Sequence, residues 1–142
     1  MLGKPDAGWT LVTIGSFHEY AGYLTDVPFD CVNACIRRIK DNVPLKITFD
    51  AEGPGLFFVS ADSKHTVITW NESDSGDPVC IPDVNDVQLV REIIHDMGRY
   101  RDGWYEWAPW GASPEELRQK FMELRAVAAE WEPLKKRARP KK

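Results

Sequence analysis

Four short segments between residues 45 and 82 are rich in β-branched and aromatic residues, and the turn sequences between them constrain the fold most. The first, 45–50, alternates strictly between apolar and polar residues, which is typical of a strand with one buried face. Glycine, proline, serine and aspartate separate it from segments at 56–60, 65–70 and 78–82. Such short connections predict antiparallel hairpins. The prolines of the last segment place it at a sheet edge, because proline cannot donate to a ladder.

A strand and a helix are predicted before this series. "TLVTIG", 10–15, is rich in β-branched residues and predicts a strand, which a loop at 16–26 follows. A helix is then expected to begin near Pro28, since proline costs no hydrogen bond in the first helical turn. Its apolar residues are spaced by three and four and predict one buried stripe: Phe29, Val32, Ile36, Ile39 and Val43.

Two further helices are predicted after the strands. The first of these is expected to begin at Asp83 or Asn85 and to end near Gly103. The last begins at Ser113, which forms a capping box with Glu116, and ends before Pro133. The element order is therefore β-α-β-β-β-β-α-α. It predicts an α+β fold, with a mostly antiparallel sheet of about five strands and helices packed on one face.

The chain length predicts one domain. We expect residues 1–8 to be a flexible N-terminal lead-in, 9–133 to form a single α+β domain, and 134–142 to be a disordered basic tail. The odd cysteine count and the lack of a secretory signal predict a cytoplasmic protein. No apolar run approaches the roughly 20 residues of a membrane helix, so no membrane partner is expected.

Charge is distributed unevenly along the chain. The net charge is −4, but six of the eighteen basic residues lie in the last eight positions, "KKRARPKK". The remaining twelve basic residues face twenty-two acidic ones, which leaves −10 for the rest. The densest segment, 50–86, has eight acidic side chains and one lysine. Such a field repels nucleic-acid phosphates and attracts basic partners.

"WYEWAPW", 104–110, contains three tryptophans. We expect one or two to pack between the second and third predicted helices, because burying one large apolar side chain contributes about 1.5–3 kcal/mol. Glu106 and Pro109 interrupt the run, so one tryptophan should stay at the surface. Tyrosine and tryptophan are common at binding hot spots. The predicted binding residues are these aromatic side chains and nearby acids: Trp104, Tyr105, Trp107, Trp110, Glu72, Asp74 and Asp77.

The loop at 16–26 is the candidate catalytic region. It places His18 beside Glu19 and Tyr20, and a histidine near a carboxylate can act as a general base. Adjacent side chains of an extended segment point to opposite faces, which weakens a direct pair between His18 and Glu19. No nucleophile motif accompanies them, and a packing or turn role is the favoured interpretation.

No metal site or cofactor is predicted. Cys31 and Cys35 are four residues apart on one helix face, but a structural zinc site needs four ligands. Cys80 with His65 or His95 would complete a site only if the fold brought them together. Buried cysteines are the simpler interpretation.

These observations favour a non-catalytic acidic binding protein that docks on a basic protein surface and inhibits or regulates it. The expected partner is a nucleic-acid-processing enzyme or a toxin, as for an immunity or anti-defence inhibitor. Acidic residues would steer the encounter, and a tryptophan would supply the anchor. One alternative is a small hydrolase-like enzyme that uses His18 and Glu19. A second is a nucleic-acid accessory protein that binds through the basic tail.

Overall fold

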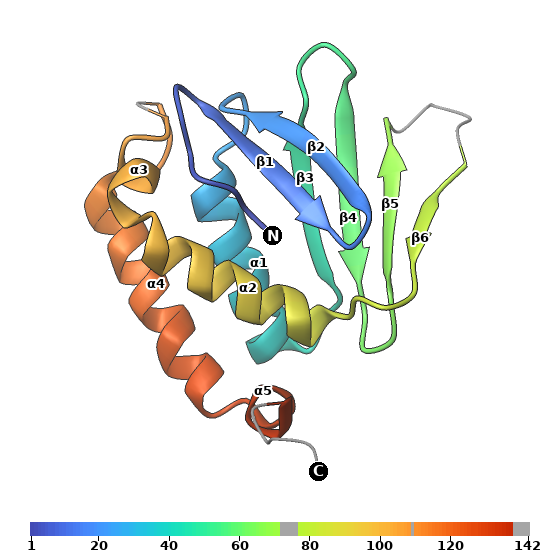
Figure 1. Cartoon of the computed structure of the whole chain (residues 1–142). Coiled ribbons are helices and arrows are strands. Elements are labelled where there is room, and N and C mark those ends of the chain that lie inside the picture. The colour runs from blue at the N-terminus through green and yellow to red at the C-terminus, as the bar shows by residue number, and fades with distance from the viewer. Residues whose placement is uncertain (72–76, 109, 138–142) are drawn as a thin grey trace.

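A computed structural model describes residues 1–71, 77–108 and 110–137 of the chain (Figure 1). The described part contains six strands: β1 Trp9–Ile14, β2 Phe17–Gly22, β3 Leu45–Asp50, β4 Leu56–Ala61, β5 Thr66–Trp70 and β6 Val79–Ile81. It also contains five helices: α1 Val27–Asp41, α2 Asp86–Arg99, α3 Arg101–Tyr105, α4 Pro114–Ala129 and α5 Glu132–Arg137. The predicted α+β class is confirmed. The strands form two antiparallel sheets, whereas one sheet of about five strands was expected.

The larger sheet has the order β3-β4-β5-β6, so each of the four predicted hairpin strands pairs with its neighbour in sequence. The short β6 lies at an edge, as its flanking prolines predict. Leu45, Ile47 and Phe49 of β3 are buried, whereas Lys46 and Thr48 are exposed, which confirms the alternation.

The smaller sheet is a hairpin of β1 and β2, and β2 occupies residues predicted to be a loop. The loop prediction for 16–26 is therefore wrong for Phe17–Gly22. Gly15, at a φ of 57°, is the first residue of the two-residue turn that joins the strands, a position that favours glycine. Figure 1 shows the hairpin lying across β3 and β4. Phe17 contacts Phe57 of β4, with ring centroids 5.5 Å apart.

The helices gather to one side of the larger sheet (Figure 1), and α1 contacts β3, α2 and α4. The structure selects Asn85 as the cap of α2, because its side chain accepts a hydrogen bond from the amide of Gln88. α2 ends at Arg99, before the predicted Gly103, and α3 follows it. The capping box at Ser113 is present at the start of α4. No helix in the described part is long and apolar enough to span a bilayer.

Both ends of the chain differ from expectation. Leu2 is buried, and the amide of Gly3 donates to the carbonyl of Leu11, so residues 1–8 do not form the flexible lead-in predicted for them. At the other end, α5 includes 134–137 of the predicted disordered tail, and Lys135 lies 3.6 Å from Glu132. Residues 138–142 lie outside the described part.

Candidate binding surface

The three tryptophans of 104–110 have different environments. Trp104 is 1% exposed, and its indole N–H donates to the carbonyl oxygen of Asp96 at 3.1 Å. Trp107 is 4% exposed and donates to the carbonyl oxygen of Thr25 at 2.9 Å. Trp110 is 56% exposed. Trp104 and Trp107 are therefore core residues and are removed from the predicted binding set, because their indoles are already buried and hydrogen-bonded.

The two buried indoles form hydrogen bonds with different parts of the fold. Their rings pack together with centroids 5.6 Å apart, and Trp104 reaches α2 through its hydrogen bond. The indole N–H of Trp107 donates to Thr25, in the segment between β2 and α1. Trp107 therefore does not pack only between two helices, in contrast to the prediction from the sequence. Tyr105, also predicted as a binding residue, is half-buried against the core.

Trp110 is held beside the start of α1. The carboxylate of Asp26 accepts a hydrogen bond from the amide of Ala112 at 2.8 Å and also caps α1 through the amide of Phe29. Gly111 lies against the same carboxylate, and a Cβ there would be 2.5 Å from its Oδ2 atom. These contacts place the segment that carries Trp110 against Asp26. Leu24, two residues before Asp26 in the chain, is 55% exposed.

The β1–β2 hairpin contributes further exposed aromatic side chains. Trp9 pairs with Gly22 and Leu11 pairs with Tyr20, so Trp9 and Tyr20 share the face of the hairpin that is turned away from the core. Tyr23 follows directly and packs over Gly8, where a Cβ would lie 3.3 Å from the ring. We call this set the aromatic surface; it comprises Trp9, Tyr20, Tyr23, Leu24 and Trp110.

Three carboxylates border the aromatic surface. Asp26 and Asp30 lie at the start of α1, and Glu52 packs directly against the backbone of Gly22. Partial desolvation and the neighbouring charge of Asp26 raise the pKa of Asp30 to about 6. None of the three forms an ion pair with a lysine or arginine in the part of the chain that the structure describes. They therefore present negative charge that the described cations do not neutralise.

In the acidic segment 50–86, in contrast, several described carboxylates are bonded to groups of the protein itself. Asp86 is buried and lies 2.6 Å from Nε of Arg38, while Asp50 accepts a hydrogen bond from the amide of Glu52. Asp62 accepts from two backbone amides, which lower its pKa. Of the predicted binding acids, Asp77 is exposed, and Glu72 and Asp74 lie outside the described residues.

The candidate catalytic residues do not converge. His18 and Glu19 are successive residues of β2 and point to opposite faces of the hairpin, because they pair with Thr13 and Val12. Tyr20 shares the outer face with His18 and belongs to the aromatic surface. This geometry does not bring an acid and a base to one substrate atom.

The cysteines are also separated by the fold. Cys31 and Cys35 are fully buried on α1, whereas Cys80 is exposed on β6. Burial raises the thiol pKa of both helix cysteines, which opposes the thiolate form that binds metals. His65 lies 3.3 Å from Asp62, and His95 lies 3.3 Å from Asp96. No group of three or more metal-ligating side chains comes together among the described residues.

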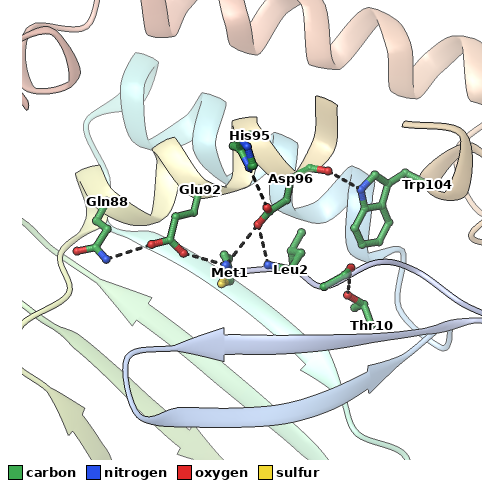
Figure 2. A network of polar contacts seen from close by, with 9 residues as sticks. Met1, Leu2, Thr10, Gln88, Glu92, His95, Asp96 and Trp104 are labelled. Atoms are coloured by element: carbon green, nitrogen blue, oxygen red, sulfur yellow. Dashed lines mark hydrogen bonds and ion pairs between the residues drawn. The ribbon is translucent and has the colours of Figure 1, made fainter. Parts of the chain in front are cut away.

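A buried polar network joins the start of the chain to α2 (Figure 2). The amine of Met1 lies 2.8 Å from Glu92 and 3.3 Å from Asp96. Asp96 also accepts a hydrogen bond from the amide of Leu2 at 2.9 Å, and its backbone carbonyl accepts from Trp104. The protein itself supplies the partners of these groups, so we interpret the network as a structural tie.

Most of the aromatic surface was missed by the sequence prediction. The alternation of Trp9 and Leu11 with buried residues is the signal that indicates an outward face, but it requires that β2 be recognised as the partner strand. Tyr23 and Leu24 carry no such signal, because their exposure depends on how the loop packs.

Comparisons with known proteins identify no relative. No protein-family model, curated protein sequence or solved structure matches this chain.

Proposed function

We propose that this is a non-catalytic binding protein that docks on a basic segment of a partner protein through the aromatic surface and inhibits or regulates that partner. The observation that carries the proposal is the exposure of Trp110 in a segment that contacts Asp26. Two neighbouring tryptophans, Trp104 and Trp107, are buried and hydrogen-bonded, whereas Trp110 offers a large rigid side chain to solvent. Tryptophan is prominent among the residues that dominate binding energy at protein interfaces.

The bordering carboxylates indicate the charge of the partner. Glu52 contacts Gly22 of the hairpin and Asp26 contacts the segment of Trp110, so carboxylates lie beside exposed aromatic residues, as in the polar rim and aromatic core of protein interfaces. Negative charge at a rim steers a cationic partner and suppresses anionic ones. A cationic groove of the kind found in nucleic-acid-processing enzymes fits this chemistry, as do basic toxins. Three free thiols suit a reducing compartment, and we propose the cytoplasm.

The alternatives receive no comparable support. An enzyme that uses His18 and Glu19 would need both side chains at one substrate, and β2 points them apart. A nucleic-acid accessory role depends on the basic tail, of which Lys135 already contacts Glu130 and Glu132.

A random 12-residue peptide library selected on the immobilised full chain tests the proposal. We expect enriched peptides to carry net positive charge and to bind the wild-type chain. Trp110→Ala should weaken their binding by about 2 kcal/mol, roughly thirtyfold, as for a hot-spot residue. Asp26 also caps α1, so Asp30→Asn is the cleaner charge variant, and it should lower the association rate.

The matched control is Met122→Ala on α4, because Met122 is 64% exposed and lies on a different element. Binding to this variant should equal wild-type binding. Enrichment of neutral or acidic peptides would overturn the proposal. So would equal losses of binding in Trp110→Ala and Met122→Ala.

A further inference from the structure

A second region of the surface has the opposite charge. An open pocket of about 600 Å³ lies between the N-terminal segment and the junction of α2 with α3, and it is lined by Lys4, Pro5 and residues 98–103. This volume is within the range of small-molecule sites. Lys4, Arg99 and Arg101 give the lining three positive charges, and Asp102 is the one carboxylate among its residues.

The three cations of the pocket are not neutralised by ion pairs within the described residues. Arg38, Lys40 and Arg118 each form an ion pair with a carboxylate, and so do Lys120 and Lys135. Lys4, Arg99 and Arg101 form none in the described part of the chain. The guanidinium of Arg99 lies over the ring of Tyr100, 5.0 Å from its centroid, and both residues line the pocket. The lining therefore carries three cations against one carboxylate, and none of the three cations forms an ion pair within the described residues.

The two walls of the pocket are held in place by buried contacts. Asp96 binds the amide of Leu2 and so fixes the segment that leads to Lys4 (Figure 2). The carbonyl of Asp96 accepts the indole N–H of Trp104, which fixes α3. Gly103 allows the close approach of the two walls, because a Cβ there would lie 2.6 Å from Cγ of Pro5. The charged side chains therefore extend from a rigid base.

The glycine at position 98 is a second observation that concerns the pocket. It lies inside α2, where glycine is the poorest helix former after proline. A Cβ at this position would meet only the Phe121 ring, at 3.9 Å, which is ordinary contact. Packing therefore does not require glycine here, and Gly98 is one of the residues that line the pocket.

We propose that this pocket binds a small phosphorylated ligand with two or more phosphate groups. Arginine guanidinium groups match phosphate oxygens in a bidentate geometry, and lysine adds a point charge. Three cations against one carboxylate suit a chain of phosphates better than a single anion. The residues that line the pocket are different from those of the aromatic surface, so substitutions can test the two sites separately.

Isothermal titration calorimetry of the full chain with sodium tripolyphosphate, ATP and citrate tests this proposal. We expect a Kd below about 1 mM for the two phosphate probes and weaker binding of citrate. The double variant Arg99→Ala/Arg101→Ala should lose at least about tenfold in affinity. Gly98→Leu should block the pocket while the helical circular dichroism is retained, since glycine is replaced by a better helix former.

Arg37→Ala is the matched control, because Arg37 is an exposed arginine on α1 without an ion pair in the described residues. Equal affinities for tripolyphosphate and ATP would assign recognition to the phosphates alone, whereas tighter ATP binding would add a contact to the nucleoside; either supports the proposal. It is overturned if neither phosphate probe binds below about 1 mM. It is also overturned if citrate binds as tightly as tripolyphosphate or if Arg37→Ala loses as much affinity as the double variant.

Discussion

At the scale of single residues, Asp96 joins more parts of the structure than its sequence context indicates. One carboxylate binds the amide of Leu2, lies beside the amine of Met1 and approaches His95. The same residue accepts the Trp104 indole N–H through its backbone. A buried carboxylate with several charged or donating partners is costly to truncate, because the partners stay buried without it.

We predict that Asp96→Ala lowers the free energy of unfolding by about 3 kcal/mol, since the buried amide of Leu2 loses its acceptor and the Met1 amine loses one of its two carboxylate neighbours. Urea denaturation followed by tryptophan fluorescence measures this loss. Glu92→Gln is the control: Glu92 is more exposed, and its replacement should cost less than about 1 kcal/mol. Similar losses in the two variants would contradict this role for Asp96.

At the scale of elements, signals that depend on neighbouring residues were read correctly from the sequence. The capping box of Ser113 and Glu116 and the alternation of Leu45–Asp50 are local patterns, and both are present in the structure. β2 was missed, because Glu19 interrupts the apolar face formed by Phe17 and Ala21. Pairing with β1, rather than its own composition, makes that segment a strand.

The start of α4 gives a prediction at this scale. The Ser113 hydroxyl accepts from the amide of Glu116 at 3.1 Å, and the Glu116 carboxylate accepts from the amide of Ser113 at 2.9 Å. Ser113→Ala should lower the free energy of unfolding by about 1 kcal/mol, because a helix N-terminal amide loses its acceptor. Ser113→Asp keeps an acceptor, and thermal unfolding should place its Tm close to that of the wild type. A wild-type Tm for Ser113→Ala would show that the cap is not needed.

At the scale of the whole molecule, the fold redistributes the charge that the sequence concentrates. Among the described acids of segment 50–86, Asp86 forms a buried pair with Arg38, Asp50 and Asp62 accept backbone hydrogen bonds, and Asp77 and Asp83 are exposed. Asp26 and Asp30 at the start of α1 and Glu52 after β3 are far apart in the sequence, yet Asp26 contacts the segment of Trp110 and Glu52 contacts Gly22 of the hairpin. The cations that line the pocket at 98–103 gather elsewhere.

The pH dependence of stability reports on Asp30. Its pKa is raised from 3.8 to about 6, so the native state binds this proton more tightly than the unfolded chain does. The resulting stabilisation is fully present below about pH 4 and is lost as the pH rises to about 6. Asp30→Asn removes the charge and should be more stable than the wild type by about 1 kcal/mol at pH 7, after allowance for solvent exposure.

Urea unfolding of both proteins between pH 4 and 7 measures this effect. Contributions from other carboxylates cancel largely in the difference, so the advantage of Asp30→Asn should grow as the pH rises. An advantage that does not change with pH would contradict the raised pKa of Asp30.

The sequence by itself determined the α+β class, three of the helices and the four-stranded meander, because helix caps and apolar periodicity act over a few neighbouring residues. Only the tertiary structure decided that Trp104 and Trp107 are buried while Trp110 faces solvent. A tryptophan side chain can stabilise the folded core when it is buried, or a complex with a partner when it is exposed. Which of the two occurs depends on contacts with a distant segment: the carbonyl of Thr25 accepts from the buried Trp107, and the carboxylate of Asp26 accepts from Ala112, near the exposed Trp110.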